Sequence, residues 1–106
     1  MAVTGKTTGA DMSNTTPILM SADNPTGWKL EELLAQVRKE LLVKTEKITG
    51  DESTESMKVQ CNNLSILRQL FNAEALQRES IAVLEAKSPD QGPTGQARIG
   101  AAHANT

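Results

Sequence analysis

The sequence of 106 residues is poor in the side chains that carry most protein chemistry. Its one cysteine, Cys61, excludes an intramolecular disulfide framework and a cysteine-rich zinc site. Its one histidine, His103, leaves little for general acid–base catalysis. Aromatic residues make up 2% of the chain, with Trp28, Phe71 and no tyrosine, which disfavours a β-sandwich or a β-barrel.

Long apolar runs are also missing. Residues 1–20 lack the apolar stretch of a secretory signal peptide, so we expect no such signal. A membrane-spanning helix needs about 20 apolar residues, and strictly apolar runs such as 18–20 and 41–43 are far shorter. The formal net charge is -2, with acids and bases interleaved, which disfavours nucleic acid as a partner. We therefore expect a chain that stays in the cytoplasm or is incorporated into a virion or a similar assembly.

Composition divides the chain into three parts. Residues 1–26 are rich in threonine and contain two prolines, while residues 88–106 contain three glycines and almost no large apolar side chain. Neither segment buries enough apolar surface to offset the entropy cost of ordering its backbone. We expect a flexible or extended N-terminal arm at 1–26, a helical region at 27–87 and a flexible C-terminal tail at 88–106.

An apolar stripe predicts a first helix at about 27–49, with Asn24 or Thr26 as its N-cap and Pro25 near its first turn. Gly50 is expected to end this helix in the left-handed conformation. The members of the stripe alternate in steps of four and three, a heptad pattern that only Lys44 interrupts. They are Leu30, Leu34, Val37, Leu41, Lys44 and Ile48.

A second helix is predicted at about 52–87, capped by Asp51, Ser53 or Thr54. Glu74 and Arg78 are four residues apart, a spacing at which they pair on one helix. The main apolar face carries Val59, Ile66, Leu67, Leu70, Ile81 and Leu84. Three apolar residues flank that face at intervals of seven: Met57, Leu64 and Phe71.

The short connection predicts an antiparallel two-helix hairpin, an all-α fold with a short first helix and a longer second one. Reflection of the sequence about Gly50 pairs Leu30 with Leu70 and brings Trp28 beside Phe71. Because the second helix is longer, its last 15 or so residues would project about 22 Å past the start of the first.

This overhang, expected at 73–87, carries apolar residues that a lone hairpin leaves in water. They are Leu76, Ile81, Val83 and Leu84. Three covers are open: the chain's own segment Ile18, Leu19 and Met20, a second copy of the chain, or a different protein.

No motif in the sequence indicates catalysis or cofactor binding. Residues 5–8, Gly-Lys-Thr-Thr, match the end of a phosphate-binding loop but lack its first glycine and a preceding strand. Cys61 lies within the second helix without a neighbouring base, as expected of a small, partly buried helix residue. His103 has no second metal ligand beside it. We therefore predict no enzyme activity, no metal and no cofactor.

The remaining features are typical of an assembly component, because a two-helix unit of about 60 residues is marginally stable alone. We expect a non-enzymatic structural subunit that acts through helix–helix packing and extended arms, in a homo-oligomer or a larger protein assembly. Its plan is similar to that of small accessory proteins of tailed-phage virions and of hairpin subunits in secretion machinery, a likeness of architecture alone. The alternative is a small helical adaptor, chaperone or regulator that binds one client helix. The expected contact residues are Trp28, Phe71, Leu76, Ile81, Val83, Leu84, Ile18, Leu19 and Met20.

Overall fold

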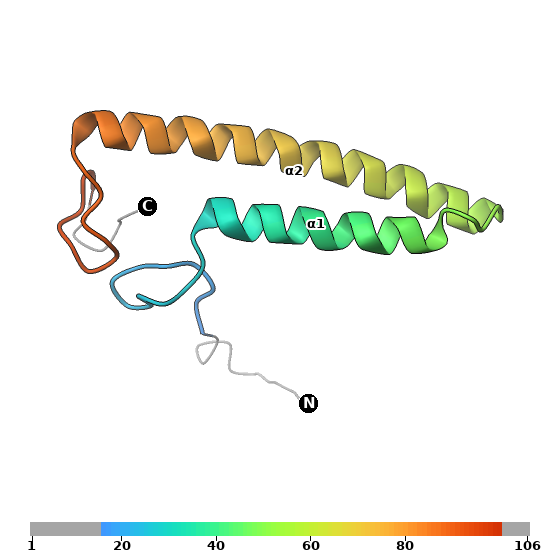
Figure 1. Ribbon diagram of the computed structural model, residues 1–106, viewed down its shortest axis with the longest axis horizontal. Helices are drawn as coiled ribbons and strands as arrows, with labels where there is room; N and C mark the ends of the chain where they lie inside the picture. The colour runs from blue at the N-terminus through green and yellow to red at the C-terminus, as the bar shows by residue number, and fades with distance from the viewer. Residues whose placement is uncertain (1–15, 101–106) are drawn as a thin grey trace.

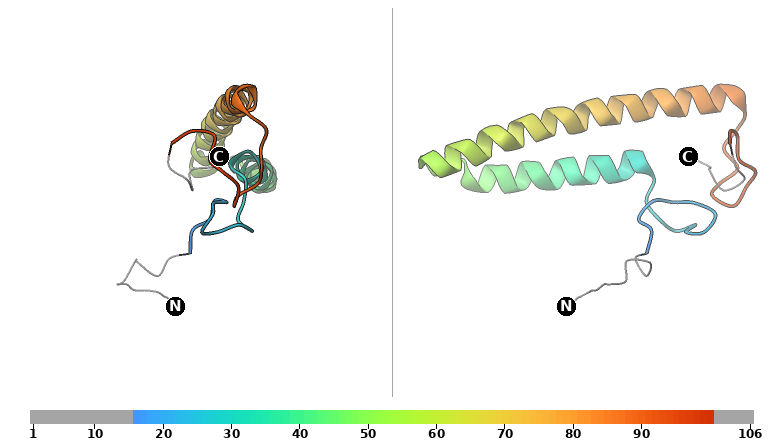
Figure 2. Two further views of the ribbon diagram at one scale, coloured as in Figure 1. Left: turned by 90° about the vertical axis from the view of Figure 1, so that its left-hand side faces the viewer. Right: turned by 180° about the vertical axis from the view of Figure 1, so that it is seen from behind.

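The computed structural model describes residues 16–100, and two helices account for most of them (Figure 1). α1 runs Leu30–Ile48 and α2 runs Thr54–Lys87. The helices lie side by side and antiparallel, joined by a short turn at 49–53 (Figure 1, Figure 2). The predicted all-α hairpin, short helix first, is confirmed. Neither helix within the described residues is long and apolar enough to span a bilayer.

The segment before α1 forms a closed loop, which we call the N-terminal loop (residues 17–28). Backbone bonds join Met20 N to the Trp28 carbonyl at 2.7 Å and Trp28 N to the Ile18 carbonyl at 2.9 Å. Gly27 is needed at the base of the loop, because a Cβ there would collide with the Asn24 side chain and lie 2.8 Å from the Ile18 oxygen. Part of the expected flexible arm is therefore a hydrogen-bonded loop.

The N-terminal loop delays the start of α1 to Leu30, three residues after the predicted start at 27. The expectation that Asn24 or Thr26 caps the helix is wrong, since the N-cap is Lys29, which makes no side-chain cap bond. The reason lies in the loop, where the Asn24 amide donates instead to the Pro17 and Leu19 carbonyls at 2.8 and 3.0 Å.

The turn at 49–53 starts α2 with local side-chain bonds. Of the three caps predicted, Ser53 is the one used, and its Oγ accepts from Ser56 N at 3.1 Å. Asp51 Oδ1 in turn accepts from Ser53 N at 2.9 Å. These bonds from Ser53 hold the pKa of Asp51 below its ordinary value.

Gly50 does not take the predicted left-handed conformation. The C-cap of α1 is Thr49, which remains right-handed and donates its backbone N–H to the Glu46 carbonyl. The Ile48 carbonyl accepts from Ser56 Oγ and from Gln60 Nε2, each at 3.1 Å. Because α2 satisfies this carbonyl, the helix end needs no left-handed residue.

The side chains between the helices follow a strict heptad pattern, which we call the seam. In α2, every third or fourth residue from Ser56 to Leu84 is buried or half-buried. The other residues of α2 are exposed, except Ala73, which is half-buried. On α1 the seam is Glu31, Leu34, Arg38, Leu41, Thr45 and Ile48. On α2 it is Ser56, Gln60, Asn63, Leu67, Leu70, Glu74, Gln77, Ile81 and Leu84.

The seam corrects the predicted register of the hairpin. Gln77 bonds to Glu31, where reflection about Gly50 placed residue 69, and Asn63 bonds to Thr45, where it placed residue 55. The cause is the turn: α2 reaches the end of α1 only at Ser56, so each α1 residue meets a residue farther along α2. The overhang is therefore shorter than the predicted 73–87, because Gln77 lies opposite the first turn of α1.

The chain turns back after α2. Ser88 is the C-cap of α2, and its backbone N–H donates to the Leu84 carbonyl at 3.1 Å. Asp90 Oδ1 accepts from Gly92 N at 2.8 Å. Gly92 has a φ of +88°, a conformation that side chains rarely adopt. Arg98 then donates from Nη1 to the Ser88 carbonyl at 3.2 Å. These bonds hold the segment 88–98 beside the open end of the hairpin (Figure 1, Figure 2).

Candidate functional site: the helix faces and the end cavity

The seam contains a bidentate ion pair in place of an apolar layer. Arg38 Nε lies 2.6 Å from Glu74 Oε2, and Arg38 Nη2 lies 3.3 Å from Glu74 Oε1. The Glu74 side chain is only 10% exposed. The predicted Glu74–Arg78 pair is therefore wrong, because Glu74 faces across to α1.

Two further polar layers cross the seam. Asn63 Nδ2 donates to Thr45 Oγ1 at 3.0 Å, and Thr45 Oγ1 donates to the Leu41 carbonyl at 2.8 Å. Near the open end, Gln77 Nε2 donates to Glu31 Oε1 at 3.2 Å. Such bonds fix the register of the two helices more than they add stability.

The outer faces of the hairpin carry more large apolar side chains than its interior. Within the described residues, the buried apolar residues are Leu67 and Leu84 alone. Many large apolar side chains on the helices are at least 44% exposed. They are Val37, Leu42, Val43, Met57, Val59, Leu64, Ile66, Phe71, Leu76 and Val83. A stable monomer rarely exposes this much apolar surface.

Three of these side chains recur every seven residues along one side of α2, and we call them the outer stripe: Met57, Leu64 and Phe71. Their side chains are 50, 59 and 57% exposed. The Arg38 guanidinium lies over the Phe71 ring, 4.7 Å from its centre. The outer stripe therefore runs along the edge of the seam where the Arg38–Glu74 pair lies.

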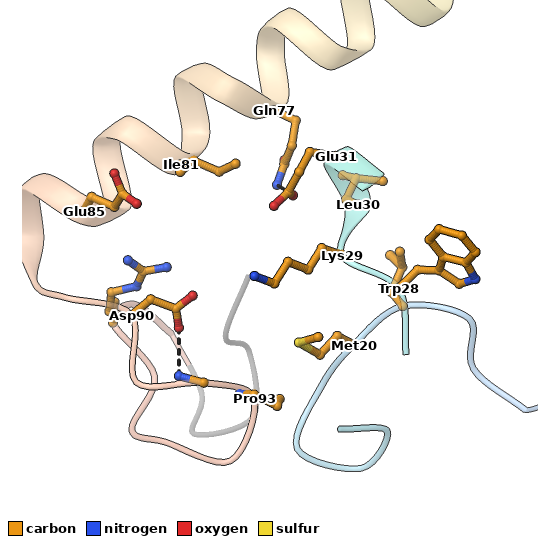
Figure 3. Close-up of a pocket in the computed structure, with 13 residues that line it drawn as sticks. Met20, Trp28, Lys29, Leu30, Glu31, Gln77, Ile81, Glu85, Asp90 and Pro93 are labelled. Atoms are coloured by element: carbon orange, nitrogen blue, oxygen red, sulfur yellow. Dashed lines mark hydrogen bonds between the residues drawn. The ribbon is translucent and has the colours of Figure 1, made fainter. Parts of the chain in front are cut away.

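The open end of the hairpin holds a cavity of about 420 Å³, the end cavity, between the N-terminal loop, both helices and the segment 88–98. Figure 3 shows the Lys29 side chain reaching into it and the Trp28 ring turned away. The remaining lining is mixed in charge, with Glu31, Glu85 and Arg98, so it favours no single sign of ligand. The apolar part of its wall is Leu19, Met20, Leu30, Ile81 and Pro93.

The structure separates the contact residues expected from sequence into three groups. Leu19, Met20, Trp28 and Ile81 line the end cavity, so the N-terminal loop does lie near the end of α2. Leu84 is buried in the seam, whereas Ile18, Phe71, Leu76 and Val83 are exposed. The predicted Trp28–Phe71 contact is wrong, because Gln77 lies opposite Glu31 and Phe71 lies beside Arg38, ten residues after Trp28.

The residues with chemical potential form no reactive cluster among the described residues. Residues 16–100 contain no group of three His, Cys, Asp or Glu side chains that could hold a metal ion. Cys61 is exposed, so the expectation that it is partly buried is wrong. His103 and residues 5–8 lie outside the described residues.

The sequence interpretation missed the polar half of the seam. It chose Leu30, Val37 and Lys44 as one row of the heptad, whereas the neighbouring row of Glu31, Arg38 and Thr45 faces α2. Both rows repeat every seven residues and adjoin the same Leu34, Leu41 and Ile48. The available signal was that each polar residue of that row has a complementary polar residue on the second helix: Gln77 for Glu31, Glu74 for Arg38 and Asn63 for Thr45.

Comparison with known proteins adds no relative: no family model, no curated protein and no solved structure matches this chain.

Proposed function

We propose that this chain is a non-enzymatic assembly subunit that acts through helix–helix packing, within a homo-oligomer or a larger structure of the virion type. The observation that carries the proposal is the distribution of apolar side chains. The seam is half polar, while Met57, Leu64 and Phe71 lie on an outer face. Removal of such a face from water contributes about 25 cal/mol per Å², so association stabilises a hairpin whose own core is small.

The polar layers of the seam support the same proposal. A polar pair in a helical interface fixes register at a cost in stability. A hairpin in which three layers of the seam are polar buries little apolar surface, so it needs a second source of stability. A partner that covers the exposed apolar faces would supply that stability. A subunit that must present those faces at defined positions also benefits from a fixed register.

The test is the mass of the full chain by light scattering over a dilution series, with helicity followed by circular dichroism on the same samples. We expect a mass above that of one chain at high concentration and a loss of helicity as the assembly dissociates. A monomer that keeps its full helicity at the lowest concentration would contradict the assembly function.

A second candidate function, an adaptor for one client helix, is favoured by the end cavity. Its apolar wall includes Leu30 and Ile81, which a client's apolar side chain would contact. The adaptor function predicts a helical monomer whose Trp28 fluorescence changes when an amphipathic helical peptide is added. Ile81→Asn, in that wall, abolishes the change, whereas Val83→Asn on the exposed face leaves it intact.

A further inference from the structure

We infer that the occupant of the outer stripe is a second copy of this chain, with the two α2 helices packed antiparallel about a two-fold axis at Leu64. The inference rests on the proposed assembly function and specifies the partner and its orientation. It places Met57 of one copy against Phe71 of the other, and Leu64 against its own counterpart.

The spacing of the outer stripe suits helix pairing. Its members recur every seven residues, so they stay on one side of a helix that winds gently around a partner. At a rise of about 1.5 Å per residue, the stripe from Met57 to Phe71 is about 21 Å long. The Arg38 guanidinium covers one face of the Phe71 ring, and that ring is still 57% exposed to a partner.

The charges at the two ends of the outer stripe identify the partner and its direction. One seven-residue step beyond Phe71 lies Arg78, and one step before Met57 lies Gly50, directly before the acidic turn residues Asp51 and Glu52. The three charged residues are exposed. A surface with opposite charges at its ends is complementary to itself when one copy is reversed, as a two-fold axis requires.

The same charges disfavour the other arrangements. In a parallel pair, Arg78 would face the partner's Arg78 and the acidic turn would face an acidic turn, both repulsive. In an antiparallel pair shifted by one heptad, Arg78 would lie against Met57 of the second copy. Only the register centred on Leu64 matches all three apolar residues and sets Arg78 near Glu52.

Cysteine cross-linking tests the axis directly, in a Cys61→Ser background that removes the native thiol. Two Leu64→Cys side chains would meet on the axis, so we expect mild oxidation to give a disulfide dimer. The matched control is Leu76→Cys, which is as exposed but lies 12 residues from the axis, and it should not cross-link. Equal yields for Leu64→Cys and Leu76→Cys would overturn the inference.

A mixture of Met57→Cys and Phe71→Cys chains tests direction. The antiparallel pair predicts mixed 57–71 dimers, whereas 57–57 and 71–71 dimers alone would overturn it. Arg78→Glu should weaken self-association about tenfold, since it affects two equivalent ion pairs. Chains with Arg78→Glu should then pair preferentially with chains carrying Glu52→Lys, and an absence of that preference would also contradict the inference.

These outcomes separate the pairing from the assembly function. If light scattering shows an oligomer but Leu64→Cys does not cross-link, the inferred pairing is wrong and the assembly function stands. If the chain is a fully helical monomer at all concentrations, both fail.

Discussion

The seam inside the hairpin and the outer stripe beside it are built on the same seven-residue repeat, but the seam is half polar whereas the outer stripe is wholly apolar. The seam buries Glu74 and Thr45 and half-buries Arg38, while the outer stripe exposes Leu64 and Phe71. In a hairpin that folds for itself alone, the apolar row lies inside and the polar row outside. Here polar residues lie inside and apolar residues outside, which is the observation behind the proposal that a partner covers the outer stripe.

The largest expected effect tests the ion pair of the seam. Glu74→Ala leaves the Arg38 charge unpaired in a largely buried position, so we expect the free energy of unfolding to fall by about 3–5 kcal/mol. Urea denaturation followed by circular dichroism measures the loss. The control is Glu79→Ala on the exposed face of α2, which should change little. The double variant Arg38→Met with Glu74→Leu should recover most of the loss, and failure to recover would mean that the pair adds net stability.

A leucine comparison sharpens the contrast between inside and outside. Leu67→Ala removes one of the two buried apolar side chains among the described residues and should cost about 2 kcal/mol. Leu76→Ala, at a position that is 63% exposed and belongs to neither the seam nor the outer stripe, should cost under about 0.5 kcal/mol. Thermal unfolding of the two variants at one concentration gives the comparison. Equal losses of unfolding free energy would mean that burial of Leu67 in the seam contributes no more stability than the exposed Leu76 does.

A smaller effect is expected at the start of α2. Ser53→Ala removes the oxygen that accepts from Ser56 N, which should cost about 1 kcal/mol. Ser65→Ala, at an exposed position inside the same helix, should be neutral or slightly stabilising because alanine favours helix. The changes in the free energy of unfolding have opposite signs in the two variants only if the cap bond stabilises α2. Urea midpoints of both variants, measured side by side, test this.

The smallest effect concerns pH. The bonds from Ser53 lower the pKa of Asp51 in the folded chain, so its carboxylate stabilises the fold above the unfolded pKa and loses that contribution as pH falls through the folded value. Compared with Asp51→Asn, the wild-type chain should keep a constant stability difference above about pH 5 that shrinks in acid. A difference that stays constant from neutral pH to pH 2 would show that the Asp51 charge has no role in the turn.

Much of the fold was predictable because it depends on local signals. The two helices, their order and the end of α2 at Lys87 follow from periodicity, turn residues and helix-end charges, and Ser53 is one of the three caps predicted for α2. The start of α1 was not predictable, because an asparagine such as Asn24 can either cap a helix or close a loop. The outcome depends on the backbone carbonyls of Pro17 and Leu19, which accept from its side chain. The exposure of Cys61 was missed for a related reason, since it depends on which side of α2 faces α1.

The sequence by itself predicted that residues 27–87 contain a helical hairpin with more apolar surface than two helices hide, because helix periodicity and apolar content are local properties. Only the tertiary structure decided the register and the facing rows, because Val37 and Arg38 are equally compatible with the seven-residue repeat beside Leu34 and Leu41. The choice fell to Arg38 because Glu74 lies opposite to pair with it. With this register Leu64 and Phe71 lie on the exposed side of α2, because the residues that face α1 are Asn63, Leu67, Leu70 and Glu74.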